Sequence, residues 1–546
     1  HLDNFIGKVI NTLEAQKDLL DEKTLDLLMT YNPEKAISSL HAENKRTHNL
    51  IHLGNKGFNL IVLSREGMQV PPAFIITTEI FRCYRAVRRF DRARNEYMRR
   101  VRAAITEIEQ LTGRVFGSPD NPLLLSVRSG AAISMPGIMS TIHNVGANEE
   151  VVAEYVANHP EAKYFAWDNY RRFLQSWGMG NGMEREDFQA LMDEHKQRHN
   201  VLYKRDFSPE EMHQLALNYQ QAVRKRGFGM PEDPWLQLIG AVDMVLDSWN
   251  NPKAQEYRHL MGVSDDWGTA VIVQTMVFGN LSTQSGSGVL FTAHPYRKVR
   301  RVALWGDYAT SDQGEDIVSG LVTSSPISVE QAEIDGRDEN KSLERLFPKI
   351  YKRLLEIGRE LVYEKEWNAQ EIEFTFEGPE PEQLFILQTR DMITIKKKEH
   401  LMVFEDSDLA HKAILAKGIG VSGSAMIGKA VFNEENIRHL RREEPDTHLI
   451  LIRQDTVPED IREISLTDGL VTSRGGQTSH ASVVATRLEK TCVVGCRDMR
   501  VYETGEFAEI NGTRIEFGTR IAIDGRHGLL IEGNYPLREE VHILPL

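Results

Sequence analysis

His480 stands in a loop whose residue types could make it a phosphate carrier. The string SRGGQTSHASVV follows an apolar stretch that predicts a strand, and Gly475 and Gly476 let the chain turn tightly. Thr478 or Ser479 can then cap a helix whose first turn contains His480. Backbone N–H groups and the helix dipole stabilise an anion there, and a neutral imidazole is a nucleophile near pH 7. Taken alone, the same string also fits an ordinary helix cap that includes a histidine.

Two strand patterns nearer the middle of the chain carry side chains that suit a triphosphate and its metal. Glu371 and Glu373 are two apart in QEIEFTFE, and Gln388 and Arg390 are two apart in QLFILQTR. Side chains two apart on a strand point to one face of the sheet. Mg²⁺ prefers oxygen ligands, and phosphates are bound by cationic side chains. These faces therefore suit a nucleotide, although a solvated strand face is the simpler alternative.

Two further cations lie beside glycines in the first quarter of the chain. Lys56 belongs to GNKGFNL, ahead of a predicted helix, and Arg128 belongs to SVRSGAA, where a buried strand runs into a glycine-containing loop. Each has an ordinary structural explanation, as a solvated loop lysine and as a salt-bridge partner. Together with the strand residues they make a phosphate site the better interpretation, because a triphosphate needs cations and backbone N–H donors.

Length and composition exclude several classes of protein. A chain of 546 residues predicts about three or four folding units. Its net charge of −14 argues against a nucleic-acid partner bound through bulk electrostatics. No apolar run reaches the length of a membrane span and no signal peptide opens the sequence, so we expect a cytoplasmic protein without a membrane partner. The three cysteines, Cys83, Cys492 and Cys496, are expected to be buried thiols in a reducing compartment.

The hydrophobic pattern predicts a multidomain protein of the α/β and α+β classes. Aromatic residues at helical spacing in YFAWDNYRRFLQSW predict the core of a helical region. The predicted segments are a helical N-terminal segment (1–48), a nucleotide-binding domain (49–390) with a helical insert (about 150–260), a linker or hinge (391–412), a β-rich domain (413–535) and a C-terminal tail (536–546).

The loop GGQTSHA resembles the phosphohistidine loop of the pyruvate phosphate dikinase and phosphoenolpyruvate synthase family. GNKGFNL, SVRSGAAISMPGIMST, QEIEFTFE and LQTR resemble that family's nucleotide-binding motifs, in the same order. The resemblance implies that His480 carries phosphate and that Thr478 is a candidate regulatory phosphorylation site. It further implies ATP and Mg²⁺ as cofactors. Glu371 and Glu373 would be the metal ligands, and the nucleotide-binding residues would be Lys56, Arg128, Gly137, Gln388 and Arg390.

The resemblance also implies a fold: an ATP-grasp nucleotide-binding domain followed by a small swivelling phosphohistidine domain. Two departures concern phosphate handling. The string FTAHP has Ala293 and His294 where the family usually has an Arg-Asn pair, and Ala132, Ile133 and Ser140 replace residues that are often charged. No segment resembles the family's C-terminal barrel, which binds phosphoenolpyruvate or pyruvate.

These observations lead to one principal hypothesis. ATP phosphorylates His480 with release of AMP, and the phosphohistidine domain delivers phosphate to pyruvate or another small molecule bound on a separate subunit or a missing domain. A homo-oligomer is compatible with this reading. Two alternatives stay open: a non-catalytic nucleotide-responsive regulatory protein, and an ADP-forming ATP-grasp kinase or ligase that does not use the histidine.

Overall fold

The structure is a computed structural model whose described residues form two units. It describes residues 27, 30–41, 46–133, 135, 138–201, 204–260, 262–294, 301–314, 324–392, 400–404, 413–421, 424–456, 460–476 and 479–541. The first unit comprises residues 1–135 and 139–276, and the second comprises 136–138 and 277–546. The division at residue 276 falls inside the segment 49–390 for which the sequence predicts one nucleotide-binding domain.

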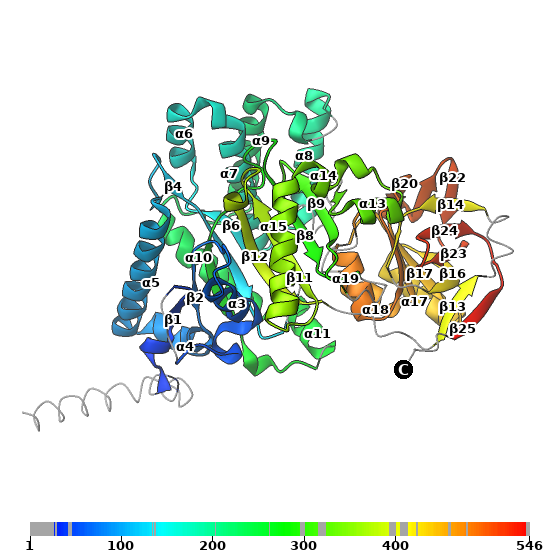
Figure 1. The fold of residues 1–546 in the computed structure, drawn as a ribbon, viewed down its shortest axis with the longest axis horizontal. Helices are drawn as coiled ribbons and strands as arrows, with labels where there is room; N and C mark the ends of the chain where they lie inside the picture. The colour runs from blue at the N-terminus through cyan, green and yellow to red at the C-terminus, as the bar shows by residue number, and fades with distance from the viewer. Residues whose placement is uncertain are drawn as a thin grey trace, which may run out of the picture. The chain divides into compact units, whose positions relative to one another are not determined.

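A five-stranded antiparallel sheet forms the centre of the first unit (Figure 1). In spatial order its strands are β1 (Ile37–Ser39), β2 (Ala73–Ile76), β7 (Ala270–Thr275), β5 (Leu125–Gly130) and β6 (Thr141–Val145). Strands β2 and β7 are buried along their whole length, as expected of apolar runs in the middle of a sheet. The short strands β3 (Val115–Phe116) and β4 (Pro122–Leu123) pair separately. Because β1 lies within residues 1–48, that segment is not purely helical: Ile37–Ser39 gains its hydrogen bonds from β2, which is distant in sequence.

The remainder of the first unit is helical, as the sequence predicts for about 150–260. Local signals fix several ends: Asn148 caps one helix, Ser208 forms a capping box with Glu211, and Asp233 precedes a helix that opens with proline. The helices are α3 (Leu50–Arg65), α4 (Thr78–Arg89), α5 (Asp91–Thr112), α6 (Glu149–Asn158), α7 (Lys163–Gly180), α8 (Arg185–His199), α9 (Pro209–Lys225), α10 (Pro234–Ser248) and α11 (Pro252–Leu260).

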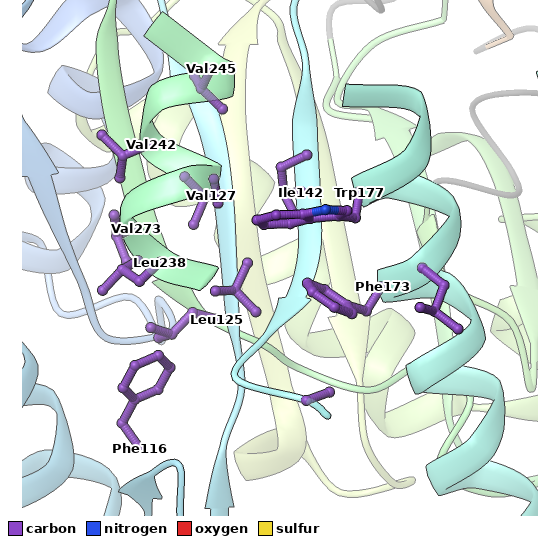
Figure 2. Packing of buried hydrophobic residues seen from close by; sticks show 14 of the residues in the cluster. Phe116, Leu125, Val127, Ile142, Phe173, Trp177, Leu238, Val242, Val245 and Val273 are labelled. Atoms are coloured by element: carbon purple, nitrogen blue, oxygen red, sulfur yellow. The ribbon is translucent and has the colours of Figure 1, made fainter. Parts of the chain in front are cut away.

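Helices α7 and α10 pack their apolar faces on the sheet of the first unit (Figure 2). Phe173 and Trp177 of α7 lie beside Ile142 of β6, while Leu238 and Val242 of α10 lie near the central strands. Spacing of three to four residues places each set on one side of its helix. The predicted helix core is therefore confirmed for the aromatic residues Trp167, Tyr170, Phe173 and Trp177, all of which are buried.

The second unit begins with another antiparallel sheet (Figure 1). Its order is β10 (Ser325–Pro326), β9 (Trp305–Thr310), β8 (Gly286–Phe291), β11 (Gln370–Phe376) and β12 (Leu384–Asp391). The associated helices are α13 (Val329–Asp335), α14 (Leu343–Leu346) and α15 (Pro348–Arg359), the last of which continues into a π-helical turn (Glu360–Glu364). Helix α15 is amphipathic and buries Ile350, Leu354 and Ile357 at helical spacing.

The β-rich domain predicted for 413–535 is built on an eight-stranded sheet (Figure 1). Its order is β14 (Ile414–Lys417), β24 (Leu529–Glu532), β23 (Arg520–Asp524), β16 (Ala425–Val431), β17 (Leu449–Arg453), β18 (Gly469–Thr472), β19 (Thr491–Val494) and β15 (Ile419–Gly420). Strands β16 to β19 are parallel, and the connections between them contain α17 (Glu434–Glu443), α18 (Ile461–Leu466) and α19 (His480–Arg487). A small antiparallel sheet follows, with β20 (Met499–Tyr502), β21 (Phe507–Ile510) and β22 (Thr513–Glu516).

The segments predicted as linker (391–412) and tail (536–546) each contain a strand. Strand β13 (His400–Phe404) pairs antiparallel with β25 (Leu537–Val541), from His400 opposite Val541 to Phe404 opposite Leu537. The two strands are more than a hundred residues apart in the sequence, so their pairing could not be read from either segment alone.

Burial and hydropathy bear on two further expectations. Cys83, Cys492 and Cys496 are buried free thiols, as predicted, and burial raises the pKa of Cys83 to about 11 and that of Cys496 to about 12. Among the residues that the structure describes, no helix is both long and apolar enough to cross a membrane.

Candidate active site

Strands β11 and β12 bring four of the predicted site residues together as two cross-strand pairs. In their antiparallel register Glu371 lies opposite Arg390 and Glu373 lies opposite Gln388. Because side chains alternate along each strand, the four side chains lie on the same face of the sheet, as the sequence pattern predicts. Glu371 is buried and forms an ion pair with the guanidinium group of Arg390.

Gln388 has an unmet hydrogen-bonding requirement. Its side chain is 3% exposed, and its Oε1 is buried without a hydrogen-bond partner among the described residues. A buried polar atom left unsatisfied costs about 1–3 kcal/mol, so such an atom at a predicted ligand site is well explained by a ligand. The ladder is irregular immediately beyond it, between Glu373 and Phe374. Bulges of this kind often re-aim side chains near active sites.

These oxygen atoms fit a magnesium nucleotide. The carboxylates of Glu371 and Glu373 and the amide oxygen of Gln388 are hard oxygen donors, and Arg390 supplies a cation beside them. Mg²⁺ usually takes one or two carboxylates and fills its remaining positions with phosphate oxygens and water. These side chains therefore supply the kinds of ligand atom that Mg²⁺ and a bound nucleotide require.

Lys56 lies just beyond a kink in α3. Gly54 has a left-handed backbone conformation (φ 65°) inside the helix, and Asn55 N–H donates to the carbonyl of Ala131 at 3.1 Å. A Cβ on Gly54 would lie 1.6 Å from the carbonyl oxygen of Gly130, so only glycine allows this approach. Helical backbone resumes after Gly54, so the rest of GNKGFNL lies in the helix and not ahead of it. The kink permits this, because it lets the helix continue after touching the end of β5.

Arg128 is on β5, two residues before that contact. Its guanidinium group donates to the side-chain oxygen of Gln274 on β7. The junction of Gly54 with Gly130 thus brings the helix turn that contains Lys56 to the strand end that contains Arg128. Gly137, the third residue predicted to hold phosphate in this part of the chain, lies outside the described residues.

One of the two residues that depart from the family pattern in FTAHP packs inside the protein. His294 is 8% exposed, and its ring lies 4.1 Å from the ring centre of Trp305 on β9. Packing of these two rings gives the histidine a role in the interior of the sheet.

His480 is the first residue of α19, as the loop pattern predicts. Ser479 is the cap residue by its backbone conformation, but its side chain makes no capping hydrogen bond to the helix backbone. Instead its Oγ lies 3.2 Å from the Oγ of Ser482, which donates to the carbonyl of Gly476 at 2.7 Å. The cap residue is thus at the predicted position, but its side chain does not form the predicted capping hydrogen bond. Thr478, the candidate regulatory site, lies outside the described residues.

The imidazole of His480 is 7% exposed and has a neighbour that the sequence did not indicate. Its Nδ1 lies 3.3 Å from the Oγ1 of Thr456, in the loop after β17. Parallel pairing of β17 with β18 makes both strands end at the same edge of the sheet, which brings the two loops together. A reader of the sequence could have found Thr456 only by first predicting that pairing.

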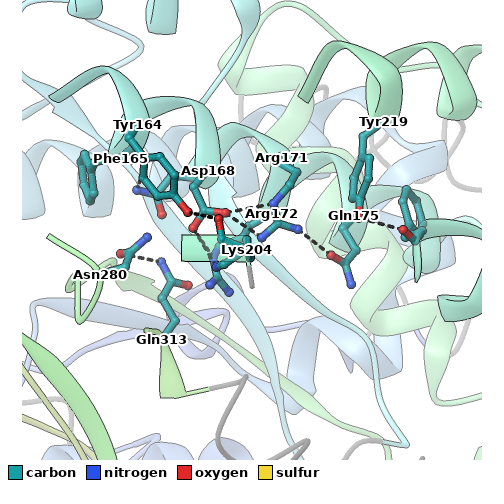
Figure 3. A network of polar contacts seen from close by, with 12 residues as sticks. Tyr164, Phe165, Asp168, Arg171, Arg172, Gln175, Lys204, Tyr219, Asn280 and Gln313 are labelled. Atoms are coloured by element: carbon teal, nitrogen blue, oxygen red, sulfur yellow. Dashed lines mark hydrogen bonds and ion pairs between the residues drawn. The ribbon is translucent and has the colours of Figure 1, made fainter. Parts of the chain in front are cut away.

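A buried cluster of charges in the first unit was also missed (Figure 3). Asp168 of α7 bonds Arg171 and Arg172 at 2.8 and 3.1 Å and lies 3.3 Å from Lys204. Burial alone would raise the pKa of Asp168, but Lys204, Arg172 and Arg171 together hold it well below its usual range. In the sequence these charges are hidden among aromatic residues that predict a helix core.

Comparison with known proteins finds two matching families. The family described as "Pyruvate phosphate dikinase, AMP/ATP-binding domain" matches residues 93–353, and the family described as "PEP-utilising enzyme, mobile domain" matches residues 445–528. Glu371, Glu373, Gln388 and Arg390 lie beyond the first match, whereas His480 lies within the second.

Individual relatives extend the likeness over most of the chain. The pyruvate, phosphate dikinase of Rhizobium meliloti (strain 1021) is 36% identical over 517 residues, which is 89% of this chain and 56% of that protein. The enzyme of the same name from Clostridium symbiosum is 33% identical over 521 residues, 89% of this chain and 57% of its own length. Pyruvate, phosphate dikinase 1, chloroplastic, of Arabidopsis thaliana is 32% identical over 518 residues, 89% of this chain and 51% of its own. The chain thus spans a little over half the length of these relatives, and its two matched regions are similar to the nucleotide-binding and mobile domains of the pyruvate phosphate dikinase family.

Proposed function

We propose that this chain is the ATP-dependent part of a dikinase-type phosphotransferase and carries phosphate on His480. The observation that carries the proposal is the place of His480, at the N-terminus of α19 and four residues after Gly476, in the region that matches a mobile domain of PEP-utilising enzymes. Backbone N–H groups at a helix N-terminus stabilise a phosphoryl group on the ring.

We assign the binding of Mg·ATP to two groups of residues, one beside the glycine motifs of the first unit and one on strands β11 and β12. Lys56 and Arg128 are cations near the junction of α3 with β5, and both are proposed to bind phosphate. Glu371 and Glu373 would ligate Mg²⁺, while Gln388 and Arg390 would bind the nucleotide. Bound Mg²⁺ would neutralise charge on the phosphates, and the protein's own groups would orient them for attack. Gly137 and Thr478 keep their predicted roles, in phosphate binding and regulation.

The chemistry follows from a histidine nucleophile and an AMP product. A ring nitrogen of His480 attacks the β-phosphorus of ATP, forming an N–P bond. The bond from that phosphorus to the oxygen bridging the α-phosphate breaks, and AMP leaves with the electron pair. The pyrophosphoryl group on the histidine then loses its terminal phosphoryl group to inorganic phosphate or water, which leaves one phosphoryl group on His480. Covalent capture divides one difficult transfer into two easier ones.

The domain that bears His480 is proposed to swivel. A histidine that receives phosphate at a nucleotide site cannot hand it to a second substrate there while nucleotide products remain bound. We place the hinge within 391–412, with β13 moving together with β25 because the two strands pair. Such domain motions commonly gate the chemistry of multistep enzymes.

The acceptor is proposed to be pyruvate or another small molecule, bound on a separate subunit or a domain outside this sequence. Pyruvate stands in the printed names of the relatives, which are nearly twice as long as the matched region. Among the described residues, no group of three or more His, Cys, Asp or Glu side chains is arranged to hold a metal ion.

Product analysis by phosphorus NMR tests the proposal. The protein is incubated with ATP and Mg²⁺, with and without inorganic phosphate, and the nucleotide products are identified. AMP supports the dikinase-type reaction. ADP would establish the kinase or ligase alternative, and unchanged ATP with nucleotide still bound would establish the regulatory one.

A further inference from the structure

Helices α4 and α5 form a strongly basic hairpin in an acidic protein. Residues 82–102 contain nine arginines and two acidic residues, which gives this stretch a net charge of +7, whereas that of the whole chain is −14. None of its cations is a lysine. Arginine is the cation that protein interfaces favour, because its planar group binds a carboxylate at two points and stacks on aromatic rings. The hairpin therefore presents the kind of charge that attracts an acidic partner.

Helices α4, α5 and α10 enclose a small hollow in the first unit. Its volume is about 20 Å³, which admits a water molecule or the end of one side chain but not a cofactor. Leu236 is 55% exposed and lies one turn before the part of α10 that lines the hollow, so it extends the apolar surface. The wall is mostly apolar and includes Tyr84 of α4, Tyr97, Met98 and Val101 of α5, and Ile239 and Val242 of α10.

Three arginines flank this hollow. The guanidinium carbon of Arg88 lies 5.5 Å from the ring centre of Tyr84, which lines the hollow. That of Arg102 lies 4.3 Å from the ring centre of Trp235 on α10, and Arg94 donates to the backbone carbonyl of Arg88 at 3.4 Å. Contact with a ring or a carbonyl restricts each guanidinium group before a partner arrives, so less side-chain entropy is lost on binding.

Two of these arginines are available to a partner's carboxylates. Arg94 and Arg102 lie one helical turn on either side of Met98, which lines the hollow, so the three share one face of α5. Arg94 pairs with Asp91 at 2.6 Å, but that carboxylate is 80% exposed, and such an ion pair contributes little. Arg102 is exposed and forms no ion pair with a described residue. Both can therefore take up a bound carboxylate at little cost.

Asp243 has one carboxyl oxygen without a partner on the wall of the hollow. Its Oδ2 lies 3.1 Å from the guanidinium group of Arg88, whereas its Oδ1 is buried and has no hydrogen-bond partner among the described residues. Buried polar atoms are normally hydrogen-bonded, so this oxygen indicates that a partner group is missing. A polypeptide backbone supplies either kind of partner: its N–H donates to a carboxylate, and its carbonyl accepts from a protonated carboxyl group.

Two other classes of anionic partner fit this surface less well. A helix that binds an anionic membrane exposes large apolar side chains beside its cations. In the part of the chain that the structure describes, no large apolar side chain of α4, or of α5 before Leu111, is exposed. A single-stranded nucleic acid needs exposed aromatic rings on which its bases stack, but Tyr97 of the hairpin is buried and its other aromatic rings are half-buried. A phosphate backbone also has no apolar group to place in the hollow.

We propose that the hollow and the three arginines at its rim, Arg88, Arg94 and Arg102, form a docking surface for an acidic polypeptide segment of a partner protein. One apolar side chain of the segment enters the hollow, and Asp and Glu residues on either side of it pair with the guanidinium groups. The backbone of the segment bonds Oδ1 of Asp243. An apolar anchor surrounded by paired charges is a common way of binding a short segment. The surface uses none of the residues assigned to phosphate chemistry, so the inference does not depend on the proposed function.

A synthetic peptide tests the surface. The probe is a fluorescent ten-residue peptide of glutamate and aspartate with one central leucine, and its binding to the full chain is followed by fluorescence anisotropy. The variant Arg94→Gln/Arg102→Gln removes two charges from the rim. The matched control, Arg198→Gln/Arg226→Gln, removes two exposed arginines elsewhere in the first unit. Thermal unfolding should be nearly unchanged in both variants, because all four side chains are exposed.

We expect the rim variant to weaken binding by roughly 10-fold and the control variant to weaken it by less than about 2-fold. Replacing the leucine of the peptide by alanine should weaken binding to the parent protein by roughly 3- to 10-fold, because less apolar surface is buried. This comparison changes only the peptide, so it does not depend on the folding of a variant. The ¹³C-methyl NMR signal of Met98 should shift when the peptide binds, which places the peptide at the hollow.

The contrary outcomes are equally specific. Absence of binding by the leucine peptide would overturn the inference, as would equal weakening by the rim and control variants, which would show only bulk attraction between charges. Equal affinity for the leucine and alanine peptides would remove the hollow from the account and overturn it too. Tighter binding of single-stranded RNA of the same charge, or of vesicles rich in phosphatidylserine, with the same shift of Met98, would replace the polypeptide by another class of partner.

Discussion

Glu371 and Arg390 face each other across the β11–β12 ladder and form a buried ion pair. Glu373 lies two residues further along β11, is less buried, and faces an amide in place of a cation. The two carboxylates therefore differ in what they do for the fold, although both are proposed metal ligands. Comparing them separates the roles in stability and chemistry.

We predict that Glu371→Gln and Glu373→Gln both reduce phosphohistidine formation by about 10²–10³-fold, because each removes a preorganised charge from the site. Only Glu371→Gln should also destabilise the protein, by about 3–5 kcal/mol, because it leaves the Arg390 charge buried and unpaired. Urea unfolding and labelling from Mg·ATP measure the two effects, with the exposed residue Glu382→Gln as control. Equal stability of the two variants would show that the ion pair contributes nothing to folding.

Gly54→Ala should destabilise the first unit by about 2–6 kcal/mol, since it combines a left-handed backbone with a clash against the carbonyl of Gly130. Gly67 is the matched control: its φ is also positive, at 78°, but nothing lies within 4 Å of an added Cβ. Gly67→Ala should therefore cost only about 1–2 kcal/mol. Thermal unfolding of the two variants distinguishes strain from close contact, and equal losses would remove the contact with Gly130 from the explanation.

Asp168→Asn should destabilise the protein by about 3–5 kcal/mol at neutral pH, because three buried or partly buried cations lose their common partner. Since the pKa of Asp168 is lower in the folded protein than in the unfolded chain, its contribution is present above about pH 4 and is lost as the pH falls further. The stability of Asp168→Asn should therefore fall less than that of the parent protein as the pH decreases below about 4. Asp193→Asn, at an exposed ion pair with Lys196, is the control and should change stability little.

The contribution of Asp243 of α10 to stability should depend on pH in the opposite direction to that of Asp168. Burial, helped by Asp247, raises its pKa to about 7, although Arg88 lies 3.1 Å away, because that guanidinium group is largely exposed and hydrated. Between about pH 4 and 7 the unfolded chain ionises while the folded carboxyl keeps its proton, so this group lowers stability as the pH rises. Asp243→Asn should therefore raise the melting temperature more at pH 8 than at pH 5. A gain that is the same at both pH values would contradict the raised pKa.

Sequence patterns that involve only neighbouring residues gave the most reliable predictions. The alternation of Glu371 with Glu373 and of Gln388 with Arg390 was correct because a strand repeats every two residues, whatever it pairs with. The helix beginning at His480 was correct because glycines and a serine before an apolar run indicate a helix start locally.

Features that depend on distant partners could not be predicted in this way. The kink at Gly54 exists because of Gly130, and β13 exists because of β25. Thr456 meets His480 only through the parallel pairing of β17 with β18. In each case the sequence contains both partners but no local sign that they meet.

The origin of the phosphorus bound to His480 tests the central claim most directly. Parent protein and His480→Asn, which keeps a similar volume without the nucleophile, are incubated with Mg²⁺ and either [β-³²P]ATP or [γ-³²P]ATP. After completion with inorganic phosphate, the account predicts acid-labile, base-stable label from the β-position in the parent, none in His480→Asn, and AMP as the nucleotide product. Label of equal strength in His480→Asn, or label retained only from the γ-position with release of ADP, would contradict it.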